Sequence, residues 1–206
     1  MDVIQEYTRP ARLVEEGKIV TKPALSEREI MYFEEAGALE AFNTDGLRSL
    51  VHTMGHIPEM KEKTLRYPGH IDLIIALQQA GFFDTTPIRF NQTEISPLDF
   101  TSRLLLKEWK LEPGEEEFTV MKVIVKGKNK TITWDLFDRY DPLTKTSSMA
   151  RTTGYTCTAA VHLITEGLFT QKGVYPPELV GDKKECFDFV MKYLRERGVN
   201  WEKSSR

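Results

Sequence analysis

Two short stretches of the sequence carry side chains that could bind a charged small molecule. The first stretch, residues 43–48, reads NTDGLR and lies at the start of a helix that we expect over Leu47–Met54. Thr44 or Asp45 can cap this helix. The free backbone amides of the first helical turn, together with the guanidinium of Arg48, would hold an anionic group. The alternative is a capped helix with a surface arginine, and taken alone this stretch favours the alternative.

The second stretch, residues 62–70, reads EKTLRYPGH. Here an expected strand delivers Arg66, Tyr67 and His70 to the edge of a turn, and the alternative is a charged edge strand. Arg48 and Arg66 together could hold the carboxylates of a substrate through paired hydrogen bonds. That chemistry is suited to the binding of an amino acid.

Several kinds of active site have no matching motif in this sequence. The 13 glycines include no pair at positions i and i+2, so GxGxxG is absent, and neither GxxxxGK nor GxSxG appears. His52 and His56 have the spacing of one helix face, but Gly55 and Pro58 interrupt that helix, so we expect no metal site. If the chain handles a nucleotide, it does so without a glycine-rich phosphate cradle of its own.

The composition is that of a globular protein with a substantial core. Of the 206 residues, 40% are hydrophobic and 29% are charged, and the net charge is -3. Nucleic acid is not the expected partner, because a general polyanion binder has a basic excess. The sequence has no apolar run long enough for a bilayer and no secretory signal, so we expect a cytoplasmic protein with no membrane partner. Cys157 and Cys186 are expected to be reduced core thiols.

The elements that must position these side chains are mostly hairpins and helices. The clearest hairpin has a turn at residues 127–129 between two alternating segments. Because the strands come mostly as hairpins, the pattern predicts an α+β fold, α/β in the broad sense, in which helices cover a mixed, mainly antiparallel sheet. Residues 202–206 are expected to be a disordered tail. We expect strands or hairpins over residues 2–7, 12–20, 38–42, 61–67, 87–95 and 117–137, and helices over 47–54, 70–79, 97–109, 149–168 and 187–194.

Six segments, in order along nearly the whole chain, match the motifs of one known family. They are EYTRPAR (6–12), LEAFNTDGLRSL (39–50), EKTLRYPGH (62–70), LFDRYD (136–141), SSMARTTGYTCTAA (147–160) and KGVYPPELVG (172–181). On these residues the chain resembles the saccharopine dehydrogenase-like oxidoreductases, and within them most of all the L-lysine 6-dehydrogenases.

The resemblance implies that residues 1–206 form a single carboxy-terminal domain for substrate binding and dimerisation, with a glyceraldehyde-3-phosphate dehydrogenase-like fold. Complete members begin with a nucleotide-binding Rossmann domain, which is absent here, so the resemblance implies an excised domain or truncated product that is inactive alone. NAD or NADP would serve the complete enzyme, and none is expected on this chain. The implied partners are an amino-acid substrate, a fused or separate Rossmann domain, and a second copy in a homodimer.

The resemblance also implies a reaction and roles for particular residues. In complete relatives the nicotinamide accepts hydride from the carbon that bears the amine, so the expected substrate is lysine or a lysine-derived amine, oxidised at its CH–NH group. Arg66 would bind a carboxylate, Tyr67 would line the pocket, and His70 would hydrogen bond or transfer a proton. The expected site residues are His70 and Tyr67 as catalytic residues, and Arg66, Thr64, Arg48, Thr44 and Asp45 as substrate-binding residues.

Two alternatives remain open at this point. One is a saccharopine reductase-like substrate, in which the amine is joined to a second amino acid, and a larger pocket with additional basic groups would favour it. The other is a non-catalytic module for amino-acid binding or dimerisation that works with a separately encoded nucleotide domain.

Overall fold

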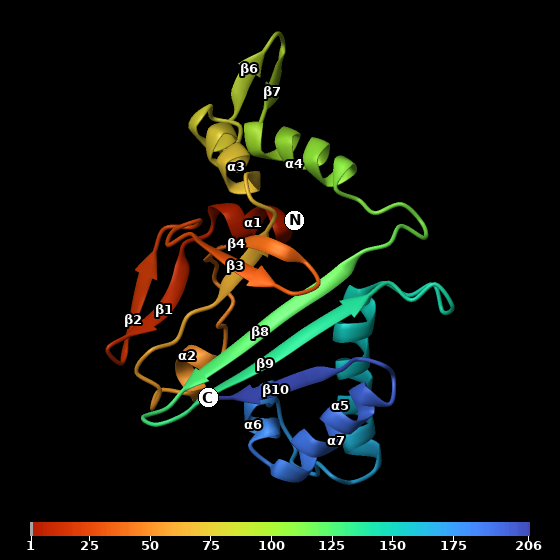
Figure 1. Ribbon diagram of the computed structural model, residues 1–206. Coiled ribbons are helices and arrows are strands. Elements are labelled where there is room, and N and C mark those ends of the chain that lie inside the picture. Colours follow the sequence, from red (N-terminus) through yellow and green to blue (C-terminus); the bar gives the residue numbers. More distant parts are fainter. Residues whose placement is uncertain (1) are drawn as a thin grey trace. The chain divides into compact units, whose positions relative to one another are not determined.

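The computed structural model describes residues 2–206, which divide after Lys110 into two compact units (Figure 1). Unit 1 ends at Lys110, and unit 2 runs from Leu111 to Arg206. Every strand pair in the described chain is antiparallel, and helices accompany the strands in both units. The predicted fold class, helices combined with mainly antiparallel sheet, is therefore confirmed.

Unit 1 begins with a helix, a hairpin and a three-stranded sheet. The hairpin turns at Gly17, whose φ of 74° lies in the left-handed region that glycine adopts without strain. The sheet has the strand order β3-β4-β5. These elements are α1 (Asp2–Thr8), β1 (Ala11–Glu15), β2 (Lys18–Lys22), β3 (Glu29–Phe33), β4 (Gly37–Asn43), the short α2 (Leu50–Thr53) and β5 (Lys63–Arg66).

The second half of unit 1 is mainly helical. Ser96 begins the last helix, because its hydroxyl oxygen accepts from the backbone amide of Asp99 at 3.3 Å and proline occupies the first helical position. The elements are α3 (His70–Gln79), the β6–β7 hairpin (Ile88–Phe90 and Thr93–Ile95) and α4 (Pro97–Glu108).

The main core of unit 1 joins α1 to the sheet and to α3. Tyr7 of α1, Phe42 of β4 and Ile71 of α3 are each no more than 1% exposed. They belong to one apolar cluster with Ile4 and Ile74. Burial of large side chains contributes roughly 1.5–3 kcal/mol for each residue, so this cluster fixes α1 against the strands.

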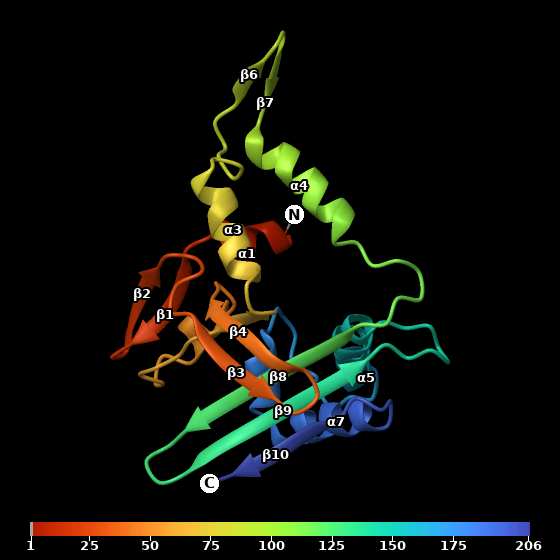
Figure 2. The ribbon, with the colours of Figure 1, turned by 45° about the horizontal axis from the view of Figure 1, so that its top comes forward.

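Unit 2 is a three-stranded sheet with helices packed on one face (Figures 1 and 2). Leu136 of the central strand clusters with Leu194 and Val199, which closes that face. The strand order is β10-β9-β8. The elements are β8 (Phe118–Lys126), β9 (Thr131–Arg139), a π-helical turn (Ala150–Gly154) that leads into α5 (Tyr155–Thr165), α6 (Pro177–Gly181), α7 (Lys184–Arg195) and β10 (Trp201–Ser205).

Three local predictions were wrong for identifiable physical reasons. Residues 2–7 form a helix, because the buried side chains Ile4 and Tyr7 recur at helical spacing. Residues 202–206 are not a disordered tail, because residues 201–205 pair with β9 as strand β10. Cys157 is exposed, and only Cys186 is buried.

The helix expected over residues 47–54 is shorter than predicted and has a different cap. Arg48 has a φ of 51°, a left-handed backbone conformation that a helix cannot include, so α2 begins at Leu50 after Ser49. Thr44 and Asp45 do not cap it, since their side chains bind elsewhere.

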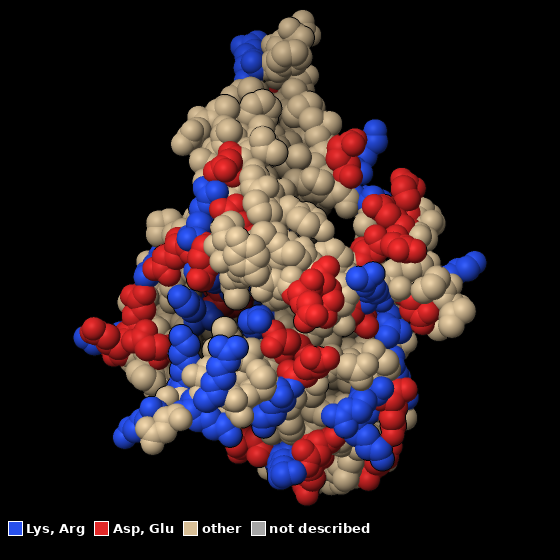
Figure 3. All heavy atoms as spheres, viewed as in Figure 1, with Lys and Arg blue, Asp and Glu red and all other residues tan. Residues whose placement is uncertain are grey.

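The surface carries charges of both signs and an area with few charges. Figure 3 shows basic side chains beside acidic ones over much of the face drawn, whereas α3 and the β6–β7 hairpin carry mostly uncharged side chains. Leu73, Ile88 and Phe90 are among the exposed apolar residues of these elements. No helix within residues 2–206 is both long and apolar enough to cross a membrane.

A buried ion pair joins the sheet of unit 2 to its first helical turn. The guanidinium of Arg151 donates from Nε to Oδ2 of Asp138 at 2.9 Å and from Nη2 to Oδ1 at 3.2 Å. Nη2 also donates to the carbonyl oxygen of Arg197 at 3.2 Å. Asp138 is 6% exposed and Arg151 is 9% exposed. Removing either partner would therefore leave a buried, unpaired charge, which strongly destabilises a fold.

The substitution Arg151→Met should therefore lower the free energy of unfolding of unit 2 by about 3–5 kcal/mol, because it leaves the Asp138 carboxylate buried and unpaired. Urea unfolding followed by tryptophan fluorescence measures this, since Trp134 and Trp201 lie on paired strands of the unit. The control is Lys184→Ala, which removes an exposed pair with Asp188 and should change stability by less than about 0.5 kcal/mol. Equal effects of the two substitutions would contradict this account.

Candidate functional site

Unit 1 contains a cavity of about 380 Å³ between α1, the loop after β4, and β5. Each of these elements supplies polar side chains, and charges of both signs face the same space. The lining residues are Gln5, Glu6, Arg9, Thr44, Asp45, Gly46, Arg48, Glu62 and Thr64.

Four of the residues predicted to bind substrate line this cavity. Thr44, Asp45 and Arg48 come from the loop after β4, and Thr64 comes from β5. The two segments are neighbours because β4 and β5 are paired, with Phe42 opposite Thr64. The structure therefore brings together the two stretches that the sequence singled out.

The other three predicted site residues lie outside the lining of the cavity. Arg66 donates to Glu6 Oε2 at 2.7 Å and to the hydroxyl oxygen of Tyr7 at 3.0 Å, so it reaches the site only through Glu6. Tyr67 is 61% exposed in the turn between β5 and α3. His70 packs beside Tyr7. The catalytic roles expected for Tyr67 and His70 stay predictions, as does carboxylate binding by Arg66.

Five lining residues were not predicted as site residues: Gln5, Glu6, Arg9, Gly46 and Glu62. Gln5 and Glu6 lie on α1, which the sequence indicated as a strand, and Arg9 directly follows that helix. Read with helical spacing, positions 5, 6 and 9 share one face, opposite the buried side chains. This helical periodicity is the sequence signal that could have identified the residues on this side of the cavity.

The loop after β4 is held in place by the Arg12–Asp45 pair. The Arg12 side chain donates from Nε to Oδ1 of Asp45 at 2.8 Å and from Nη2 to Oδ2 at 3.0 Å, and the Arg12 backbone amide also reaches Oδ1 at 3.2 Å. These hydrogen bonds from Arg12 hold the pKa of Asp45 below its usual range. Asp45 is therefore an ionised anchor for the loop.

Glu62 differs from the other carboxylates of the cavity because its hydrogen-bond partner is neutral. The buried hydroxyl of Thr44 donates to Glu62 Oε2, and Thr44 Oγ1 also lies 2.9 Å from Oγ1 of Thr64. Burial raises the pKa of Glu62 and outweighs the hydrogen bond from Thr44, which lowers it. The charge of Glu6 also raises this pKa, whereas the backbone amide of Gly46 and the charge of Arg48 lower it. The carboxyl of Glu62 is thus less stable as an anion than one at the surface.

A second polar cluster lies beside the cavity, around Tyr7. The Tyr7 hydroxyl oxygen lies 3.0 Å from Nε2 of His70, and Trp109 packs against both rings. Because Arg66 can only donate to the Tyr7 oxygen, the hydroxyl proton of Tyr7 can point to His70. Burial and the charge of Arg66 lower the pKa of His70, which keeps the imidazole neutral near pH 7.

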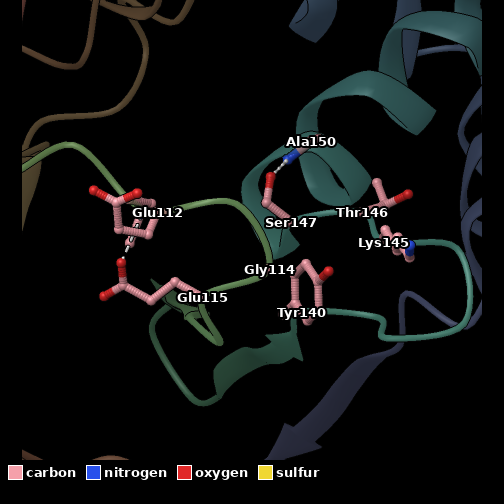
Figure 4. A pocket seen from close by; sticks show the side chains of 9 residues that line it. Glu112, Gly114, Glu115, Tyr140, Lys145, Thr146, Ser147 and Ala150 are labelled. Carbon is pink, nitrogen blue, oxygen red and sulfur yellow. Dashed lines mark hydrogen bonds between the residues drawn. The ribbon is translucent and has the colours of Figure 1, made fainter.

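Unit 2 has a cavity of its own of about 320 Å³, beside Tyr140 and Lys145 (Figure 4). Two of its polar side chains are engaged with the backbone: Ser147 Oγ accepts from the amide of Ala150 at 3.2 Å, and Glu115 accepts from the amide of Glu112 at 2.8 Å. We therefore take the cavity of unit 1 as the candidate site. Within residues 2–206, no group of three or more His, Cys, Asp or Glu side chains could hold a metal ion.

Comparison with known proteins places the chain in a family. A family model described as the saccharopine dehydrogenase C-terminal domain matches residues 1–199, which include nearly all of both units. The chain belongs to this family. The fold is also similar to that of the apo histidine-tagged saccharopine dehydrogenase (L-Glu forming) from Saccharomyces cerevisiae, with a TM-score of 0.76 and 18% sequence identity. The match covers 99% of this chain and 60% of that protein, so the chain spans less than two thirds of the yeast enzyme.

The family match confirms the resemblance to the saccharopine dehydrogenase-like family that was inferred from the six sequence segments. A saccharopine dehydrogenase C-terminal domain is consistent with a domain of an amino-acid oxidoreductase, and complete enzymes of this family use NAD(P). The structural similarity, at 18% identity, supports the fold alone.

The Tyr7 cluster gives a testable pH dependence. His70 should titrate below the usual histidine pKa of about 6.5, because burial and Arg66 both disfavour its charged form. The substitution Arg66→Met should move its pKa upward toward that value, since it removes the positive neighbour. NMR titration of the His70 ring protons measures both values.

The control for this titration is Arg48→Met, because Arg48 has no part in the shift of His70. This variant should leave the His70 pKa unchanged. A His70 pKa above the usual value in the unsubstituted chain, or the same response to both substitutions, would contradict the described cluster.

Proposed function

We propose that this chain is the substrate-binding part of an NAD(P)-dependent amino-acid oxidoreductase that acts on the CH–NH group of lysine or a lysine-derived amine. The observation that carries the proposal is the unit 1 cavity, which combines acidic and basic side chains in about 380 Å³. A zwitterionic amino acid carries a carboxylate and an ammonium group, which can pair with basic and acidic side chains respectively. The family match supports the reaction class.

Arg48 is the residue best suited to receive the carboxylate of the substrate. It lines the cavity, its side chain is exposed, and it stands on a left-handed backbone with a φ of 51°. A non-glycine residue in that region costs of order 1–3 kcal/mol, and such strain is concentrated at functional sites. Arg66 supports the site indirectly, through its ion pair with Glu6.

The nucleotide cofactor does not fit the residues of this cavity. Gly46 is the only glycine in the lining, and the Glu62 side chain covers its α-carbon, so the loop offers no open cradle for a pyrophosphate. The proposal therefore assigns NAD(P) to a nucleotide-binding domain, fused or separate. It also includes a homodimer, which rests on the family resemblance, and a cytoplasmic location, which rests on the sequence pattern.

His70 and Tyr67 keep proposed roles in this scheme. The 3.0 Å contact between Tyr7 and His70 supports His70 as a group that exchanges a proton, because a neutral imidazole can accept one near pH 7. Tyr67 is proposed to close one side of the bound substrate, and its exposure is consistent with a contact that forms only with substrate or with a second domain.

A saccharopine-type substrate is the second candidate, and Arg9 favours it. Arg9 adds a second guanidinium to the cavity, where it donates to the side-chain oxygen of Gln5. Saccharopine carries more carboxylates than lysine, so an additional cation would be used by the larger ligand. The two candidates differ in whether Arg9 contributes to binding.

Binding to the 206-residue chain tests the proposal. Lysine, saccharopine and a polyamine precursor are added at millimolar concentration, and backbone amide shifts are followed by NMR. Lysine or saccharopine should shift the amides of residues 44–48 and 62–64. Arg48→Met should weaken binding about tenfold or more, because hydrogen bonds to charged groups contribute roughly 1.5–3 kcal/mol.

The matched control is Arg89→Met, an exposed arginine in the β6–β7 hairpin that does not line the cavity. It should leave the affinity unchanged. The substitution Arg9→Met separates the two candidates, since it should weaken saccharopine and spare lysine. No shift around the cavity with any of the three ligands would overturn the proposal.

A further inference from the structure

The carboxylates that line the unit 1 cavity fall into two classes. Glu6 is paired with Arg66 at 2.7 Å, and Asp45 is paired with Arg12 at 2.8 Å. Glu62 forms no ion pair within the described part of the chain, and the partner that donates to its Oε2 is the neutral hydroxyl of Thr44. Glu62 is thus the cavity carboxylate that no arginine binds directly, although the backbone amide of Gly46 and the charge of Arg48 favour its anionic form.

The side chain of Glu62 is nevertheless held in place by its neighbours. A β-carbon added to Gly46 would lie 2.4 Å from both Cδ and Oε2 of Glu62 and 2.7 Å from its Cγ. No real β-carbon approaches another atom so closely, so the glycine leaves the space that the Glu62 side chain occupies. The hydroxyl of Thr44, which is itself in contact with Thr64, donates to Oε2 and so also holds the carboxyl group.

The opposite charge on the cavity wall, that of Arg48, differs from Glu62 in its exposure to solvent. Arg48 is exposed, whereas Glu62 is half-buried between Gly46 and Thr44. An amino acid whose carboxylate binds the exposed Arg48 could extend its side chain toward the half-buried Glu62. A cation at the end of that side chain would meet the cavity carboxylate that forms no ion pair among the described residues.

From this geometry we propose that Glu62 receives the side-chain ammonium group of the bound amino acid and so selects diamino acids over amino acids with neutral side chains. The inference rests on the proposed function, because it assigns the residue that determines specificity in the same site. Burial disfavours the anionic form of Glu62, and the incoming ammonium would supply the missing stabilisation.

The charged groups that face Glu62 support this assignment. Glu6 on α1 and Arg9 just after it line the same cavity, as do Asp45 and Arg48 of the loop after β4. Glu6 and Asp45 are already neutralised by their arginines. Glu62 is the carboxylate in this set that a ligand cation can pair with without breaking an existing ion pair.

The test compares L-lysine with L-norleucine, which has a methyl group where lysine has its terminal ammonium. Dissociation constants are measured by NMR titration of the 206-residue chain. We expect the chain to bind lysine at least tenfold more tightly than norleucine. In Glu62→Gln this ratio should fall to near one, with norleucine binding retained. The amide keeps the shape of the side chain and can still accept from Thr44.

A second variant tests the positioning of Glu62 without changing its charge. Gly46→Ala should displace the Glu62 side chain and lower the lysine preference at least threefold. The matched control is Gly55→Ala, because an added β-carbon at Gly55 has no atom within 4 Å. This control should keep the full preference.

The outcomes separate the inference from the proposed function. If the unsubstituted chain binds neither amino acid, the proposed function fails and the inference fails with it. If it binds both but Glu62→Gln keeps the lysine preference, the inference alone is overturned. Arg48→Met should weaken norleucine as well as lysine, since both carry the same α-carboxylate.

Discussion

The candidate site depends above all on the ion pair between Arg12 and Asp45. Three hydrogen bonds from Arg12, one of them from its backbone, tie the loop after β4 to the first hairpin. Once Asp45 is anchored, Thr44 on one side of it faces β5, and Gly46 on the other side approaches Glu62. The carboxylate of Asp45, which the sequence indicated as a helix cap or a substrate ligand, therefore anchors the loop. Its neighbours in the loop remain available to contact a ligand.

The anchored loop helps to explain which charged side chains of the cavity form ion pairs and which do not. Acidic side chains with an arginine partner stabilise the fold, because each pair is satisfied before any ligand arrives. Glu62 and Arg48 are held by geometry instead, one by a neutral hydroxyl and a glycine, the other by a left-handed backbone. A fold that half-buries a carboxylate without an ion pair and holds an exposed arginine on a left-handed backbone gives up some stability there, as functional sites commonly do. The cavity therefore offers a ligand one anionic group, Glu62, and one cationic group, Arg48.

Much of the fold could be predicted from the sequence, and the reasons for the errors are physical. The hairpin around residues 127–129 and the helix over residues 70–79 have strong local signals, namely turn residues and a regular apolar period, and both were confirmed. Strand β10 could not be predicted, since its polar residues gain order only by pairing with β9. The motif at residues 43–48 was recognised, but Glu62 was missed as a site residue because its importance comes from a close approach to Gly46, 16 positions away, which spacing does not reveal.

The central claim is that unit 1 binds an amino acid with its side-chain ammonium against Glu62, and contacts between a bound ligand and the protein test it most directly. In isotope-filtered NMR of the labelled chain with unlabelled lysine, the methylene group next to the terminal ammonium should show nuclear Overhauser effects to protons of Gly46 and Thr44, because both residues adjoin Glu62. Contacts from that methylene group to residues 140–150 of unit 2 instead, or no contacts at a lysine concentration that saturates binding, would contradict the account.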